Sequence, residues 1–143
     1  MSTKHSETLS SLRKTFFSGK TKDIDFRKNQ LKALFRFLSE NESLIVSALS
    51  EDLRKPPFET RLAELENVYN DIRGQLFNLD QYVSHKSVAK SLVTIADDAF
   101  IHSEPYGLVL IISAWNYPIM VTIGPLVGAI AAGIHQKCYK TFD

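Results

Sequence analysis

The most informative polar residue of the sequence is Asn116, in the stretch SAWNYP at residues 113–118. It follows LVLII at 108–112, an uncharged run of branched residues that is typical of a buried strand. An amide beside a dry interior needs hydrogen-bond partners, because an unpaired buried amide costs free energy. Asn116 is therefore either a structural turn residue or a functional hydrogen-bond donor, and both interpretations stay open at this point.

The other residues that could take part in catalysis or bind a metal are scattered along the chain. The four histidines form no cluster with acidic residues at ligand spacing, so no metal site is predicted. The single cysteine, Cys138, lies in a polar stretch, where an inert surface thiol is a better interpretation than a nucleophile. Gly19-Lys20-Thr21 matches the end of a phosphate-binding loop, but Lys14 stands where that pattern requires glycine. We interpret it as a loop before a helix.

Composition narrows the class of protein. The chain has 143 residues, which suits one domain, and 17 basic against 16 acidic residues give a net charge of +1. That balance favours neither nucleic acid nor anionic lipid as a partner. One cysteine allows no internal disulfide and fits a reducing compartment, so we predict a cytoplasmic location.

A membrane anchor has to be considered for residues 105–134, which carry no charge. A bilayer span needs only about 20 apolar residues. Pro118, Pro125 and Asn116 interrupt the run, however, and it divides into a short strand, a turn and a helix. We favour the buried strand and helix, and a small membrane-anchored helical protein remains an alternative.

The elements that must position Asn116 begin with a helical segment at residues 1–90. Helical spacing predicts one amphipathic helix after Ile24 and a second after Asn41, a potential N-cap, which Pro56 and Pro57 end. In the second helix the expected buried stripe is Leu44, Ile45, Ala48, Leu49 and Leu53. A third helix has the clearest periodicity, at Phe58, Leu62, Leu65, Tyr69, Ile72, Leu76, Leu79 and Val83.

The remainder of the chain has a different pattern. LVTIA at 92–96 and AFIHS at 99–103 predict a β-hairpin. We expect the strand at 108–112 to be buried on both faces of a parallel sheet. The helix after SAWNYP contains Gly128, Ala131, Ala132 and Gly133, small enough to allow close packing. The polar residues at 134–143 are a poor candidate for a central strand. Helices followed by strand, turn and helix predict an α/β protein.

Two stretches resemble a known family. EPYGLVLIISAWNYPIMVTIGPLVGAIAAG, at 104–133, is similar to the first strand–turn–helix of the nucleotide-binding domain of aldehyde dehydrogenases. The form WNYP, and LRKTFFSGKTKDIDFRKNQLKALFRFLSENESLIVSALSEDLRKPPFET at 12–60, resemble the class 3 branch, which acts on fatty and aromatic aldehydes. The resemblance implies a Rossmann-like fold, of which this chain would form the amino-terminal portion.

The resemblance also implies a reaction, the NAD- or NADP-dependent oxidation of an aldehyde to an acid. A cysteine thiol attacks the aldehyde, hydride passes to the nicotinamide, and a glutamate activates the water that releases the acid. Asn116 would be the oxyanion-hole donor, and the backbone of Ala114 and Trp115 would line the cofactor. We expect packing of Trp115, together with Pro118, to hold the turn rigid.

Residues 134–143 depart from the family pattern, and Cys138 does not match the family nucleophile. The expected organisation is a helical segment at 1–90, hairpin strands of an oligomerisation sheet at 91–104, the start of the nucleotide-binding domain at 105–133 and a non-family tail at 134–143. The first hypothesis is a truncated oxidoreductase that is inactive as this chain. The second is a non-catalytic module that binds full-length subunits, and a homodimer is also considered.

Overall fold

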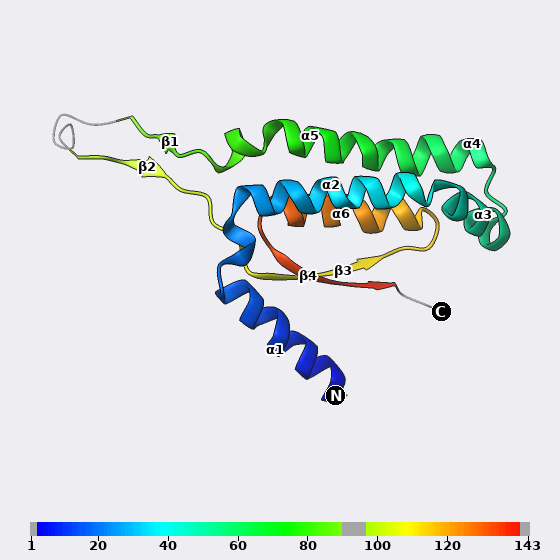
Figure 1. Cartoon of the computed structure of the whole chain (residues 1–143), viewed down its shortest axis with the longest axis horizontal. Coiled ribbons are helices and arrows are strands. Elements are labelled where there is room, and N and C mark those ends of the chain that lie inside the picture. The colour runs from blue at the N-terminus through cyan, green and yellow to red at the C-terminus, as the bar shows by residue number, and fades with distance from the viewer. Residues whose placement is uncertain (1–2, 90–96, 141–143) are drawn as a thin grey trace.

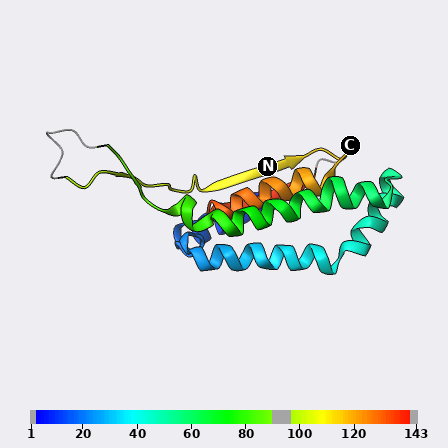
Figure 2. The same ribbon diagram turned by 90° about the horizontal axis from the view of Figure 1, so that it is seen from above.

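The computed structural model describes residues 3–89 and 97–140 of the chain. Most of the helices form a layer on one side of a small parallel sheet, and the first helix lies on the other side of that sheet. A two-stranded arm extends away from this body (Figures 1 and 2). The expected mixture of an amino-terminal helical layer with a strand–turn–helix unit is therefore confirmed.

The amino-terminal helices are α1 (Thr3–Phe17), α2 (Ile24–Glu40) and α3 (Glu42–Leu53), with a 3-10 turn at Lys20–Lys22. The carboxylate of Asp23 caps α2 by accepting from Phe26 N at 2.6 Å. Asn41 stands at the predicted start of α3 but does not cap it, because its amide donates to the Phe37 carbonyl of α2. The predicted stripe of α3 is correct at Leu49, whereas Leu44 is 68% exposed.

A long helical segment follows, made of α4 (Pro57–Glu59), a π-helical stretch (Thr60–Leu65) and α5 (Glu66–Val83). From Leu65 onward the predicted apolar stripe faces the core. The first two positions of the prediction were wrong, since Phe58 is 74% and Leu62 57% exposed. The wider turns of the π stretch change the helical phase, so that Thr60 and Glu64 face inward instead.

The projecting arm contains β1 (Lys86–Ser87) and β2 (Phe100–Ile101), which pair antiparallel (Figure 1). The second strand of the predicted hairpin is thus present. Its partner among the described residues is Lys86–Ser87, upstream of the predicted first strand. The predicted strand at 92–96 lies outside the described residues.

The strand–turn–helix unit consists of β3 (Leu108–Ser113) and α6 (Pro118–Ala131), and β4 (His135–Lys140) follows. β4 pairs parallel with β3, with Leu108 opposite His135 and Ser113 opposite Lys140. The tail was predicted to be unsuited to a central strand, and it forms an edge strand of this two-stranded sheet. A β–α unit delivers the chain back to the sheet, and an edge strand tolerates polar side chains.

β3 is buried on one face only, contrary to prediction. Ile111 and Ser113 are buried, whereas Leu110 and Ile112 are 58% and 61% exposed. The reason is that α6 covers one face, while α1 covers only part of the other. α1 and the start of β3 enclose a groove of about 680 Å³ lined by apolar residues such as Phe16 and Leu108.

The core lies where α6 meets α2 and α5. Its buried members are Leu31, Leu38, Val46, Leu65, Val68, Tyr69, Ile72, Leu79, Val127 and Ala131. α6 also packs on β3 and β4, so it is covered on both sides. Of its predicted small positions, Ala131 is buried and Gly128 is exposed. None of the helices in the described ranges has both the length and the apolar character that a bilayer crossing demands.

Candidate functional site

The site is the turn that joins β3 to α6. Pro118 occupies the first turn of α6, where its missing N–H costs nothing. The N-cap residue, Tyr117, makes no side-chain capping bond. The first backbone N–H groups of α6 must therefore be satisfied by another part of the chain.

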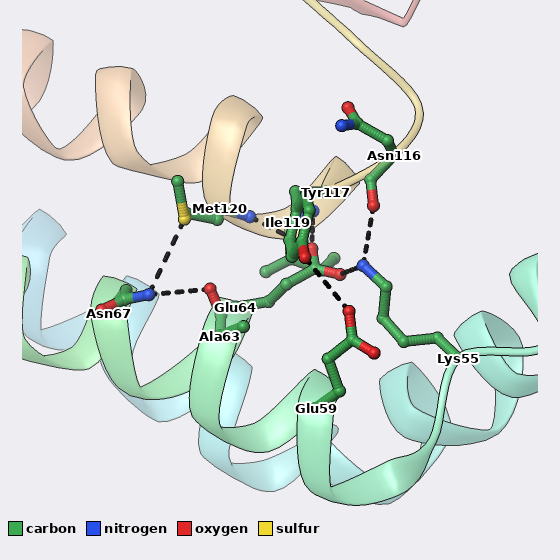
Figure 3. Close-up of polar contacts among 9 residues, drawn as sticks. All are labelled: Lys55, Glu59, Ala63, Glu64, Asn67, Asn116, Tyr117, Ile119 and Met120. Carbon is green, nitrogen blue, oxygen red and sulfur yellow. Dashed lines mark hydrogen bonds and ion pairs between the residues drawn. The ribbon is translucent and has the colours of Figure 1, made fainter.

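Glu64 satisfies them from the π-helical stretch of the neighbouring helix. Its carboxylate is fully buried, and Oε2 accepts from Ile119 N at 2.7 Å and from Met120 N at 3.3 Å (Figure 3). A negative charge is favourable at this position, because the amino-terminal end of a helix carries a partial positive charge. Glu64 thereby ties the start of α6 to the helical layer.

Lys55 completes the arrangement. Its side chain is 7% exposed, and Nζ donates to Glu64 Oε1 at 2.6 Å and to the Asn116 carbonyl oxygen at 2.7 Å. The ammonium group also lies 3.8 Å from the centre of the Tyr117 ring. An ammonium has three N–H donors, so these three contacts can use all of them.

Tyr117 is anchored at its far end as well. Its hydroxyl donates to Glu59 Oε1 at 3.1 Å, on the helical turn before the π stretch (Figure 3). Nearby, Asn67 donates to the Ala63 carbonyl at 2.7 Å and reaches Met120 Sδ at 3.7 Å. Side chains of the segment between Lys55 and Asn67 therefore hold both the turn and the first residues of α6.

The three residues singled out from the sequence lie together on this turn, and all three are exposed: Ala114, Trp115 and Asn116. The Asn116 amide points away from Lys55 and Glu64, and it makes no hydrogen bond to the residues that the structure describes (Figure 3). The expectation that packing of Trp115 stiffens the turn was wrong, since its side chain is 58% exposed. Lys55 holds the backbone instead.

Sequence reasoning missed Lys55 and Glu64. The spacing of Glu64 was a local signal of its burial. It lies four residues after Thr60 and four before Val68, and residues at this spacing share one helix face, which here is buried. An acidic residue in a buried row requires a partner. No comparable signal marks Lys55, which simply precedes the Pro56-Pro57 pair.

A second buried charge, Arg27, has a structural role. Its guanidinium donates to three carbonyl oxygens, those of Thr21 at 2.7 Å, Lys22 at 2.7 Å and Ala131 at 3.2 Å. Burial lowers the pKa of Arg27, and Asp23 opposes that effect. The Gly19-Lys20-Thr21 stretch leads into α2, as predicted, with Lys20 and Thr21 in the 3-10 turn. Its contact with Arg27 was not predicted. Cys138 lies on β4, paired with Ile111 across the sheet.

The fold and the turn define an α/β protein in which polar groups are presented at the carboxyl end of a parallel strand, the usual place for ligands in such folds. The pattern of the aldehyde dehydrogenase family matches residues 6–136. The chain belongs to the aldehyde dehydrogenase family.

Curated relatives agree with this assignment. Aldehyde dehydrogenase family 3 member B1 of Bos taurus is 49% identical over 127 residues, which are 89% of this chain and 27% of that protein. The dimeric NADP-preferring aldehyde dehydrogenase of Rattus norvegicus is 43% identical over 128 residues, which are 90% of this chain and 28% of that protein. The chain thus spans about a quarter of the length of these relatives.

Solved structures match as well. The substrate-bound AldH of Staphylococcus aureus superposes with a TM-score of 0.90 at 35% identity, over 93% of this chain and 29% of that one. The glyceraldehyde-3-phosphate dehydrogenase GapN of Methanocaldococcus jannaschii, solved with NADP, gives a TM-score of 0.79 at 22% identity, over 93% of this chain and 28% of that one. The second likeness concerns the fold alone.

Proposed function

We propose that this chain is the amino-terminal portion of an NAD- or NADP-dependent enzyme that oxidises aldehydes to carboxylic acids, and that Asn116 donates a hydrogen bond to the oxyanion formed during the reaction. The observation that carries the proposal is the exposed Asn116 amide, which makes no hydrogen bond within residues 3–89 and 97–140, on a turn whose backbone Lys55 binds at 2.7 Å. A donor held in place before the reaction costs no reorganisation when the charge develops.

The residues beside Asn116 fit a dinucleotide. Ala114 and Trp115 are exposed at the carboxyl end of β3, so their backbone is open to a ligand there. When bound, the nicotinamide would accept the hydride that the aldehyde loses. The single cysteine of residues 1–143 supports a cytoplasmic location, because it suits a reducing compartment.

We further propose that residues 1–143 alone do not turn over aldehyde, because they supply the oxyanion donor without a matching nucleophile. The assay is NADH or NADPH formation by the purified chain with a long-chain aldehyde. A measurable rate above that of heat-denatured protein would refute this part of the proposal.

The role of Asn116 can be tested in a chimera in which residues 1–136 replace the matching segment of the Bos taurus relative. Replacing Asn116 with Ala should lower kcat by about 10²–10³, the typical effect of removing one oxyanion-hole donor. The control is Asn41→Ala, since Asn41 bonds only within the helical layer at the end of α2. An unchanged kcat for the Asn116 variant would contradict the proposed role.

A second candidate function is association with full-length subunits, supported by the projecting β1–β2 arm. Phe100 and Ile101 are consecutive on β2 and are 52% and 56% exposed, and adjoining exposed apolar side chains can form an interaction surface. Co-expression with a full-length family 3 subunit, followed by size-exclusion chromatography, should give a mixed species that Ile101→Lys abolishes. If no mixed species forms with the unmodified chain, this function is excluded.

A further inference from the structure

One buried ion pair holds the Asn116 turn at two separate points. Lys55 donates to the carbonyl of Asn116 itself at 2.7 Å, and Glu64 accepts from the backbone of Ile119 at 2.7 Å. The two charged groups also bind each other at 2.6 Å. The backbone from Asn116 to Ile119 is therefore fixed at both of its ends relative to the helical layer.

A buried ion pair is by itself weak evidence for a purely stabilising role. Lys55 and Glu64 are 7% and 0% exposed, so both charges have lost most of their hydration. Apolar residues of similar size often stabilise a protein as well as or better than a buried ion pair does. What apolar residues cannot do is accept from the N–H groups of α6 and donate to the Asn116 carbonyl.

Asn116 needs such a support because its side chain has no other restraint within the described residues. Its amide makes no hydrogen bond there, and the neighbouring Trp115 is largely exposed. The position of the amide therefore depends on the placement of its own backbone (Figure 3).

We propose that Lys55 and Glu64 are positioning residues that hold Asn116 where an oxyanion develops, an inference that rests on the proposed function. Neither residue touches the reacting atoms. Their effect passes through the Asn116 carbonyl and the first turn of α6. A displacement of about 1 Å in a catalytic group can lower a rate by about 10²-fold.

The test measures kcat and the KM for aldehyde in the chimera carrying residues 1–136, per mole of folded enzyme. Lys55→Met and Glu64→Gln should each lower kcat by about 10-fold to 10²-fold, with a much smaller change in KM, because the donor acts mainly on the transition state. The matched control is Lys28→Met, which breaks the exposed pair between Lys28 and Asp80 at 2.8 Å. It should leave kcat unchanged.

A double variant separates positioning from stability. Lys55→Met combined with Glu64→Gln leaves no unpaired buried charge and keeps an oxygen that can accept from Ile119 N. We expect it to melt at a higher temperature than either single variant while kcat stays low. Recovery of kcat together with the melting temperature would show a merely structural pair and overturn the proposal.

The Asn116→Ala background gives the second criterion. If Lys55 acts through Asn116, Lys55→Met should change kcat less than about 3-fold once the amide is gone, because coupled residues are not additive. An Asn116→Ala variant with normal kcat would refute the proposed function and this inference together. A slow Asn116→Ala variant beside a fully active Lys55→Met variant would refute this inference alone.

Discussion

Gly133 ends α6 in a position that should accept no side chain. Its φ is +74°, a left-handed conformation that favours glycine. A Cβ atom added there would lie 2.7 Å from Arg27 Cζ and 2.7 Å from the Thr21 carbonyl oxygen. Replacing Gly133 with Ala must therefore displace the Arg27 guanidinium from its three carbonyl partners or move the backbone.

Two contributions set the expected loss in the free energy of unfolding for Gly133→Ala. The left-handed conformation costs a residue with a Cβ about 1 kcal/mol. Weakening one hydrogen bond of a buried charged group adds about 1.5–3 kcal/mol. We therefore expect Gly133→Ala to lower the free energy of unfolding by about 3 kcal/mol.

Gly19 provides the matched control. Its φ is +77°, almost the same, but an added Cβ would meet nothing within 4 Å. Gly19→Ala should therefore show the backbone term alone, about 1 kcal/mol.

The assay is urea unfolding of residues 1–143, with circular dichroism as the signal that reports loss of helix. For a chain of this size, about 1 kcal/mol corresponds to about 3 °C in melting temperature, so the two variants should also differ clearly on heating. Equal destabilisation by the two substitutions would refute the steric argument and the tight packing of Arg27 against Gly133.

Two further predictions concern buried positions. Tyr69→Phe should raise the free energy of unfolding by about 1 kcal/mol, because its buried hydroxyl has no hydrogen-bond partner in the described structure. Burial, reinforced by Glu42 and Glu66, raises the pKa of Tyr69. Because the folded state disfavours the ionised phenol, the stability that depends on a neutral Tyr69 is complete below about pH 10 and is lost as the pH rises further. The free energy of unfolding, measured with urea between pH 8 and 11, should therefore fall less steeply with pH for Tyr69→Phe. The unmodified chain and the exposed control Tyr82→Phe should both show the steeper fall. On β3, Ile111→Ala should cost about 2–5 kcal/mol and Leu110→Ala less than about 1 kcal/mol, and equal urea midpoints would contradict the one-sided burial.

Local patterns predicted the elements well. The apolar spacing of Tyr69, Ile72 and Leu79 identified the buried face of α5, and the break at SAWNYP separated β3 from α6. These signals are local, because one face of a helix or the length of a strand is encoded within a few consecutive residues.

Predictions failed where the answer depended on a partner distant in the sequence. The run at 108–112 looked equally apolar at every position, yet Leu110 is exposed because only α6 covers its strand fully. The edge strand at 135–140 likewise depends on its pairing with β3. The π stretch rotated Phe58 and Leu62 outward and Glu64 inward, which uninterrupted helical periodicity could not show.

For the candidate site the division is equally clear. Local sequence was enough to place Asn116 on a turn between a strand and a helix, and resemblance to a family indicated the chemistry. What holds that turn depends on tertiary packing. Lys55 and Glu64 are distant in sequence from Asn116 and Ile119, the residues they respectively contact, and reach them only because α6 packs on the helical layer. A buried charge is stable only beside its partners, and those partners are set by the packing of distant segments.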